Sequence, residues 1–220
     1  MSSSERRTVS GHQGKGERGK DDRAPLSRQR IFEAALAVAH SGGGSAVTMR
    51  RVARVLGVEA MSLYHHVRDR EDLLDGMAET MVRTGLVAPQ AGMPISVMLT
   101  NFARGIRATA LAHPEAFRLV GLRPLRSAEA SGATTGLLSA LGAAGMSAES
   151  AVISYRVVAA YARGFSLSEI AGLTFGPGVD MTLPVDLLPY SPTLRQDTGA
   201  TFEAGLAAIV DGFNRSLPSA

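Results

Sequence analysis

Residues 47–75 have the spacing of two short helices joined by a glycine, with a third helix directly after them. Apolar residues recur at i, i+3, i+4 and i+7 in the first helix, at Met49, Val52, Ala53 and Leu56. This period buries one face of that helix, and Thr48 can cap its N-terminus. Gly57 permits the tight turn that follows, because glycine adopts the left-handed backbone without steric cost. Leu63 and Val67 give the second helix an i, i+4 apolar pair, so the segment predicts a helix-turn-helix.

The other faces of these two helices are polar. Arg50, Arg51 and Arg54 lie opposite the apolar stripe of the first helix. The second helix offers hydrogen-bonding and stacking groups, at Ser62, Tyr64, His65 and His66. A DNA-binding helix-turn-helix has this arrangement, since its second helix packs on the first and still presents polar side chains to a groove. The segment therefore predicts a DNA-binding domain.

At these residues the chain resembles the TetR family of bacterial repressors. The family's recognition-helix signature is LGV, four residues, LY, one residue and HV, followed by a basic residue and LL. Here it reads Leu56-Gly57-Val58, Leu63-Tyr64, His66-Val67, Arg70 and Leu73-Leu74. Upstream, residues 31–38 resemble the family's first helix, so the similarity covers about residues 28–76. The chain departs from the pattern at Glu59, where a Ser or Thr cap is common, and at Ala60 and Met61, where other residues often touch bases.

The resemblance and the polar face together predict a set of DNA contacts, at Thr48, Arg50, Arg51, Ser62, Tyr64, His65, His66 and Arg70. Most of these would bind phosphates, which position the protein, whereas Ser62 would contact base edges, which specify sequence. Tyr64 would bind a phosphate or a thymine. Each residue also has a purely structural interpretation: a helix cap for Thr48, a packed aromatic ring for Tyr64, and solvated side chains for the cations.

The charge of the chain is unevenly distributed. Residues 1–70 hold 13 Lys and Arg and 7 Asp and Glu, residues 71–220 hold 10 and 13, and the whole chain carries +3. A basic first third on an acidic body is an electrostatic footprint for a polyanion. Residues 1–24 are too polar to form a core, so we expect a disordered basic arm there. That arm is either a leader without contacts or a source of added phosphate and minor-groove contacts.

We expect an all-α fold with a three-helix helix-turn-helix DNA-binding domain at residues 25–69 and a helical ligand-binding and dimerisation domain at residues 70–220. The first helix is predicted at residues 26–40, with Ile31, Ala35 and Val38 facing inward. Period, caps and breakers predict further helices at residues 70–87, 95–112, 128–144, 148–172 and 195–216, and a short one ending near residue 122. Four prolines between residues 175 and 194 predict a long loop.

Several classes of protein are disfavoured. The chain has no apolar run long enough to span a membrane and no apolar signal segment, so we expect it in the cytoplasm. It has no cysteine. The adjacent His65 and His66 point about 100° apart on a helix and cannot both bind one metal ion. We find no Ser/His/Asp set, paired carboxylates or nucleotide loop, so we expect no metal, no cofactor and no enzymatic activity.

The resemblance implies a ligand pocket in the helical body. The residues we expect to line it are Asn101, Phe102, Ile106, Arg118, Leu122, Leu141, Tyr155, Val158 and Tyr161. The alternative for any apolar member of this set is ordinary core packing, since periodicity alone does not predict a pocket.

Two long helices with apolar faces end the chain. Family architecture implies that they form a four-helix bundle with the same helices of a second subunit. The expected interface residues are Phe165, Phe202, Leu206, Ile209 and Phe213. A two-fold dimer would place two recognition helices on successive turns of one DNA face. The alternative is that the last apolar stripe packs only within its own chain.

These observations predict a homodimeric transcriptional repressor that binds a palindromic operator and is released by a small, mostly apolar ligand. There are two alternatives. The regulator could respond to a protein partner in place of a small molecule, or it could be an activator of the same fold. The tetracycline-binding members of the family have an Arg-Pro corner. A His four residues before this corner and a Thr one residue before it help hold magnesium. Here the corner is Arg123-Pro124, and the same steps lead to Leu119 and Leu122. We therefore expect no response to magnesium–tetracycline, because leucine cannot ligate a hard cation.

Overall fold

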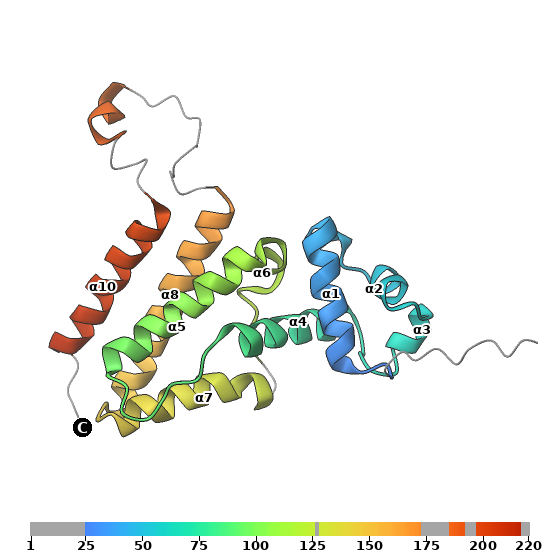
Figure 1. Cartoon of the computed structure of the whole chain (residues 1–220), viewed down its shortest axis with the longest axis horizontal. Helices are drawn as coiled ribbons and strands as arrows, with labels where there is room; N and C mark the ends of the chain where they lie inside the picture. Colours follow the sequence, from blue (N-terminus) through green and yellow to red (C-terminus); the bar gives the residue numbers. More distant parts are fainter. Residues whose placement is uncertain (1–24, 126–127, 173–184, 192–196, 217–220) are drawn as a thin grey trace, which may run out of the picture.

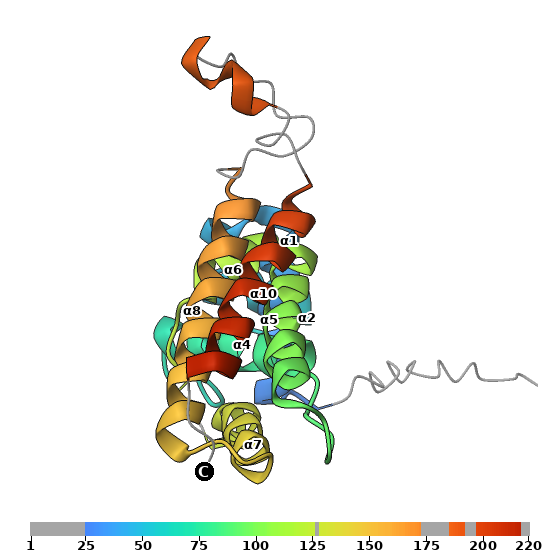
Figure 2. The ribbon, with the colours of Figure 1, turned by 90° about the vertical axis from the view of Figure 1, so that its left-hand side faces the viewer.

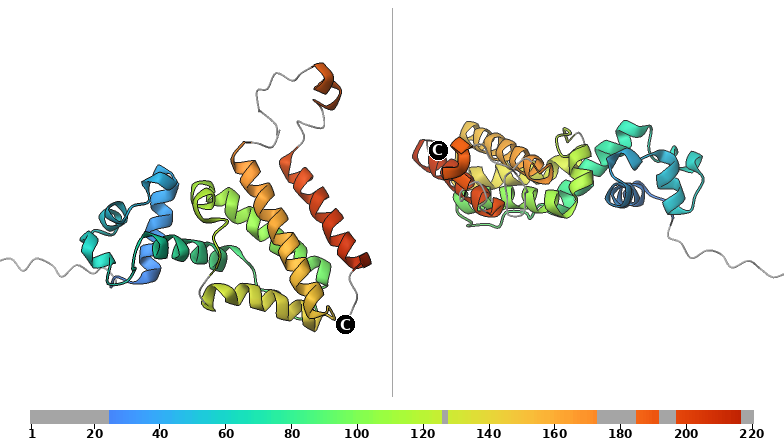
Figure 3. Two further views of the ribbon diagram at one scale, coloured as in Figure 1. Left: turned by 180° about the vertical axis from the view of Figure 1, so that it is seen from behind. Right: turned by 90° about the horizontal axis from the view of Figure 1, so that it is seen from above.

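The chain is helical throughout the part that the structure, a computed structural model, describes, namely residues 25–125, 128–172, 185–191 and 197–216. In chain order the elements are α1 (Arg28–Gly42), η1 (Gly44–Ala46), α2 (Met49–Leu56), α3 (Ala60–Leu63), α4 (Arg70–Gly85), α5 (Ile95–Ala112), α6 (Pro114–Val120), α7 (Ala128–Ala143), α8 (Ala148–Ile170), η2 (Val185–Tyr190) and α10 (Thr198–Ser216). These residues contain no β-strand. Figures 1 and 3 show α1–α3 at one end of an elongated molecule and α10 toward the other.

The first three helices form the predicted helix-turn-helix. The Thr48 hydroxyl accepts a hydrogen bond from the Arg51 backbone N–H at 3.2 Å and so caps α2. Gly57 ends α2 with φ 70°, in the left-handed region where only glycine is unstrained. Ile31, Val52 and Leu63 are all fully buried between these helices. Burying each such side chain stabilises the domain by about 1.5–3 kcal/mol.

The second helix of the motif is shorter than the sequence predicts. Regular helix ends at Leu63, and residues 64–66 continue as turns. Glu59 precedes α3 without a side-chain capping bond, so the first turn of this helix lacks the support that Ser or Thr would give. Val67 still donates its backbone N–H to the Leu63 carbonyl at 2.9 Å, which keeps Val67 in the core, 1% exposed.

Helix α4 joins the helix-turn-helix to the body. Asp69 caps it by accepting a hydrogen bond from the Asp72 backbone N–H at 2.8 Å. It packs against α1 so closely that a Cβ added at Gly76 would lie 2.1 Å from Cζ of Phe32. On its other sides α4 contacts α5, α6 and α7, so one helix touches both parts of the molecule.

The body is built around α5 and α8, which make the most extensive helix contact in the chain. Figure 2 shows α10 alongside both of them, and its contacts with each agree. Arg107 of α5 holds the ends of the three helices together, because it pairs with Glu169 of α8 at 2.6 Å and Glu169 also accepts from Thr198 of α10. The predicted helix at residues 95–112 matches α5, and the other helix boundaries agree to within about three residues.

Two predictions fall outside the described residues: the basic arm at residues 1–24, and most of the loop at residues 175–194. Within the described ranges, no helix has the length and apolar character needed to cross a bilayer.

Candidate functional site

The outward surface of the helix-turn-helix combines cations with apolar and aromatic groups. Seven of the eight predicted contact residues lie in α2, in α3 or in the segments that flank these helices, Arg70 is the first residue of α4, and none of the eight is buried. Tyr64 is 46% exposed just after α3, and Arg50 is exposed on α2. Met61 is 71% exposed on α3, although sequence analysis did not select it. An exposed thioether at this position can contact a thymine methyl group, which is how apolar side chains contact base edges.

Three of the predicted contact residues also make local contacts. The guanidinium of Arg51 lies against the end of α1, where a Cβ added at Gly42 would be 2.8 Å from Nη2 of Arg51. The side chain of His66 is half-buried, and its backbone carbonyl accepts a hydrogen bond from Arg28. Arg70 begins α4, with Nη1 3.9 Å from Oε1 of Glu71. Arg51 is therefore turned partly toward its own domain, whereas Arg70 stays exposed.

Asp72 ties the first turn of α4 to the DNA-binding end. Its carboxylate is buried and accepts hydrogen bonds from Nη2 of Arg28 at 2.8 Å and from the Arg68 backbone N–H at 2.9 Å. The hydrogen bond from Arg28 lowers the pKa of Asp72, more than burial raises it. Arg28 belongs to α1 and Arg68 to the turn after α3, so a shift of α4 must move both.

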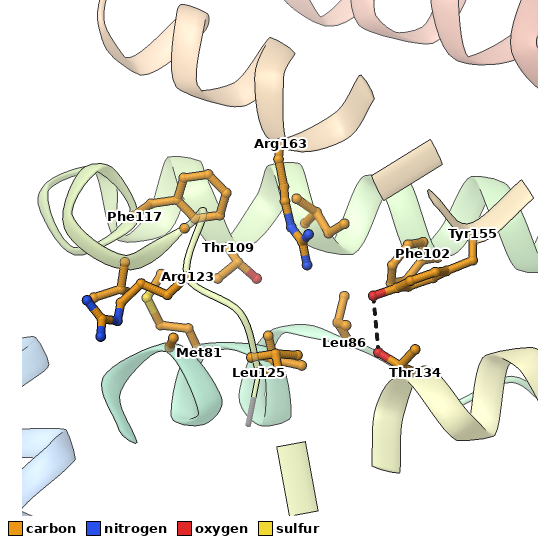
Figure 4. A pocket seen from close by; sticks show the side chains of 15 residues that line it. Met81, Leu86, Phe102, Thr109, Phe117, Arg123, Leu125, Thr134, Tyr155 and Arg163 are labelled. Carbon is orange, nitrogen blue, oxygen red and sulfur yellow. Dashed lines mark hydrogen bonds between the residues drawn. The ribbon is translucent and has the colours of Figure 1, made fainter. Parts of the chain in front are cut away.

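The body contains a cavity between α4, α5, α6, α7 and α8, which Figure 4 shows from close by. The described lining residues are Ala78, Met81, Val82, Leu86, Phe102, Ile106, Thr109, Phe117, Val120, Gly121, Arg123, Leu125, Thr134, Tyr155 and Arg163. Most of them are apolar, and the polar members are three hydroxyl side chains and two arginines. A mostly apolar lining with a few polar groups is typical of a small-molecule site.

Three of the predicted pocket residues line this cavity: Phe102, Ile106 and Tyr155. The rings of Phe102 and Tyr155 lie 5.5 Å apart between centroids, and the Tyr155 hydroxyl is 3.3 Å from the Thr134 hydroxyl. Asn101 is exposed and lines a neighbouring hollow of about 660 Å³ with Leu86 and Phe102.

Comparison with known proteins places the chain in a family. The family model for bacterial regulatory proteins, tetR family, matches residues 31–77. The tetracycline repressor protein class A from transposon 1721 of Escherichia coli is 33% identical over 202 residues, which are 85% of this chain and 90% of that repressor. The chain belongs to the TetR family. It is a DNA-binding transcriptional regulator and not an enzyme.

Solved TetR structures agree with this fold. TetR(class A) in complex with 5a,6-anhydrotetracycline and magnesium is 30% identical, covers 86% of this chain and 99% of that chain, and superposes with a TM-score of 0.66. ActR of Streptomyces coelicolor in complex with actinorhodin has a TM-score of 0.73, covering 89% of this chain and 98% of that chain. Its identity is 24%, so it supports the fold alone.

Five of the pocket residues predicted for this TetR protein do not line the cavity. Leu141 and Val158 are fully buried in the core, and Leu122 is 70% exposed. Arg118 is exposed and donates to the Ile170 carbonyl and to Glu115. Tyr161 donates to the Phe202 carbonyl at 2.9 Å, where it packs against α10. Helix α8 is buried on several sides, so its apolar period does not reveal which residues face the cavity.

The interface prediction for α10 also needs correction. Phe202 and Leu206 are 0% and 1% exposed within the single chain, so they are core residues. Phe202 stacks on Tyr161 at 5.4 Å between centroids and meets Phe165 edge-on at 5.3 Å. Three further predicted residues, Phe165, Ile209 and Phe213, are half-buried against the same core. The apolar stripe of α10 is thus used mainly by α5 and α8 of its own chain.

The cavity contains residues that sequence analysis missed. Ala78, Met81 and Val82 come from α4, and Arg163 comes from α8. Arg123 lines the cavity and also reaches α4, with Nε 2.8 Å from Oδ1 of Asp75 and Nη2 2.8 Å from Oε2 of Glu71. The Arg-Pro corner at Arg123 was visible in the sequence, but its partners on α4 lie about 50 positions upstream. No local pattern could show them.

The described lining of the cavity in this TetR chain offers no ligand set for a divalent cation, because it includes no His, Asp or Glu. Elsewhere in the described ranges, no three His, Asp or Glu side chains are grouped closely enough to bind a metal. Leu119 lies against η1, where a Cβ added at Gly44 would be 3.4 Å from Cβ of Leu119.

Proposed function

We propose that this protein is a homodimeric repressor that acts in the cytoplasm, binds a palindromic operator and leaves it when a small, mostly apolar ligand fills the body cavity. The observation that carries the proposal is the double role of α4. Its middle turns supply Ala78, Met81 and Val82 to the cavity wall, and its first turn holds Asp72 against Arg28. An apolar cavity with a few polar groups favours a small molecule over a protein partner.

Release would follow from a shift of α4. A ligand between Met81 and Phe102 would press on α4 directly, and it would also act through Arg123, which pairs with Glu71 and Asp75. A moved α4 would carry α1 and the turn after α3, and so change the separation of the two recognition helices. Such coupling is reciprocal: the operator must weaken ligand binding by the same factor as the ligand weakens operator binding.

We propose that the dimer forms through the outer faces of α8 and α10. Large apolar side chains are exposed there on α8, with Val152, Ile153 and Val157 36%, 40% and 41% exposed. Small residues, such as Gly164 on α8 and Ala204 on α10, continue the exposed faces and permit close helix packing. A Cβ added at Gly164 would meet nothing within 4 Å, which leaves room for a partner helix.

The experiment is a titration of the inverted repeat in the intergenic DNA beside the protein's own gene. Wild-type protein should bind it with a Kd of about 10⁻⁸–10⁻¹⁰ M at moderate salt. Tyr64→Ala should weaken specific binding by about 1–3 kcal/mol, because it removes an exposed contact without opening the core. Tyr190→Ala is the matched control, since Tyr190 is a 61% exposed tyrosine in η2. Equal binding by Tyr64→Ala and wild type would contradict the proposed DNA surface.

A further inference from the structure

Arg163 is a cation that faces the cavity without a carboxylate. Figure 4 shows its side chain pointing from α8 into the cavity, near Thr109, Phe102 and Tyr155. It is half-buried, and no hydrogen bond or ion pair to it is found within the described residues. Two arginines of α5 behave differently: Arg104 and Arg107 each hold a glutamate with two nitrogens.

Among the described lining residues of the cavity, no Asp or Glu compensates the charge of Arg163. The second arginine of the lining, Arg123, is already neutralised by Glu71 and Asp75. Taking a guanidinium partly out of water beside apolar walls is costly unless it gains a partner. Within the described residues, Arg163 therefore has an unmatched positive charge.

A second hollow adjoins the cavity. It shares Arg123, Leu125, Thr134, Tyr155 and Arg163 with the first, and adds Pro124 and Thr135. Figure 4 shows Arg163 between two groups of lining residues, with Met81, Phe117 and Arg123 on one side and Phe102, Tyr155 and Thr134 on the other. The combined space thus has apolar walls, several hydroxyl groups and a guanidinium without a described partner.

We propose that the effector is an anion: a flat apolar body carrying one carboxylate or a similarly acidic group, which Arg163 binds through its two-pronged guanidinium. Arginine suits this role because its planar fork matches a carboxylate and stays charged at all relevant pH values. The Tyr155 and Thr134 hydroxyls line the same cavity and would donate to the acidic group, and Met81, Phe102 and Phe117 would pack on the apolar body. This proposal rests on the proposed function, which makes the cavity the effector site.

Two fluorescent probes of one skeleton test the proposal. 1-Anilinonaphthalene-8-sulfonate carries an anionic group, and N-phenyl-1-naphthylamine lacks it. Full-length wild-type protein should bind the sulfonate roughly tenfold or more tightly than the neutral probe, because a hydrogen-bonded charge pair is worth about that factor. Val82→Trp, which fills the cavity, should weaken both probes and so show that they bind there.

Charge-removing variants identify the residue responsible. Arg163→Gln should lower sulfonate affinity about tenfold to the level of the neutral probe and leave the neutral probe unchanged. Arg163→Lys should restore part of the loss. Arg215→Gln removes the same charge from an exposed site on α10 and should change neither probe. Thermal unfolding of each variant checks that the fold is retained.

The outcomes separate this proposal from the proposed function. Unchanged sulfonate affinity in Arg163→Gln, or an equal loss for both probes, would overturn the anion site. Wild type that binds both probes equally and is released from operator by the neutral one would also overturn it, while the repressor function stands. Selective sulfonate binding by a protein that does not bind the inverted repeat would support the anion site and contradict the repressor.

Discussion

Two arginines of α2 and two of α5 differ in whether a carboxylate pairs with them. Arg50 and Arg54 of α2 are exposed and, within the described residues, have no carboxylate partner. Arg104 and Arg107 of α5 instead form two-nitrogen pairs with Glu203 and Glu169, at 2.6–2.9 Å. Paired arginines join helices of the fold, whereas unpaired arginines remain available to an anion from outside.

Arg163 extends this comparison into the body. It is the lining arginine that no described carboxylate neutralises, and it faces a cavity and not open solvent. On this view the DNA surface and the effector cavity both present free guanidinium groups, for phosphates and for an anionic ligand. The following predictions test whether the residues assigned to binding differ in effect from the residues assigned to the fold.

The largest effect should come from the exposed apolar face of α8. Val157→Asp would leave an unpaired charge in the proposed dimer interface, while the isolated chain should tolerate it because Val157 is 41% exposed. We expect monomers in sedimentation and a loss of operator affinity of roughly a hundredfold or more. Val87→Asp, at an 86% exposed valine outside this face, should remain dimeric and bind normally. A dimeric Val157→Asp would place the interface elsewhere.

Two arginines of α5 allow a partly buried ion pair to be compared with an exposed one. Side chains of the Arg107–Glu169 pair are 20% and 10% exposed, and those of Arg104–Glu203 are 55% and 42% exposed. Glu169→Gln should lower the free energy of unfolding by about 3 kcal/mol, because Arg107 stays buried without its counter-ion. Glu203→Gln should cost less than about 1 kcal/mol. Urea unfolding measures both, and equal losses would refute the role given to burial.

Asp72 should make stability depend on pH. Its pKa is lowered in the folded protein by Arg28, so its contribution is fully present above the unfolded value near 4 and is lost as pH falls through the folded value. Asp72→Asn should cost about 2 kcal/mol at pH 7. The difference in the free energy of unfolding between variant and wild type should become smaller below pH 4. A difference that stays constant down to pH 2 would show that the effect of the substitution is not electrostatic.

Magnesium–tetracycline should have no effect on operator binding. The cavity lining lacks His, Asp and Glu, and Leu119 and Leu122 occupy the positions that help hold magnesium in the tetracycline-binding members. Hard cations need oxygen or imidazole donors. Titration of the protein–operator complex should show no release at micromolar drug with millimolar magnesium. Release under these conditions would mean that the cavity binds the chelate without those two positions.

The helix-turn-helix could be predicted in detail because its signals are local. The Thr48 cap, the left-handed Gly57 and the buried Leu63 all act within a few residues of one another. The one error, the length of α3, lies at its C-terminal end, where residues 64–66 continue as turns. The membership of the chain in the TetR family was predicted from the same segment.

The body was predicted as helices but only partly as a site. The ends of α5 follow from Pro94 and from the His113-Pro114 break, and both were read correctly. The cavity was not predicted, because which side chains of α8 face it depends on how α8 packs against the other helices, including α4, which is far away in sequence. An amphipathic stripe likewise shows that Phe202 is buried, but not whether its own chain or a partner covers it.

The salt dependence of operator binding tests the division between free and paired arginines most directly. Arg50→Gln should weaken binding by about 1 kcal/mol and lower the slope of log affinity against log salt by about one per half-site, because a phosphate contact is lost. Arg104→Gln removes the same charge from a paired site and should leave the slope at the wild-type value. Equal slopes for wild type and both variants, or a change confined to Arg104→Gln, would contradict the account.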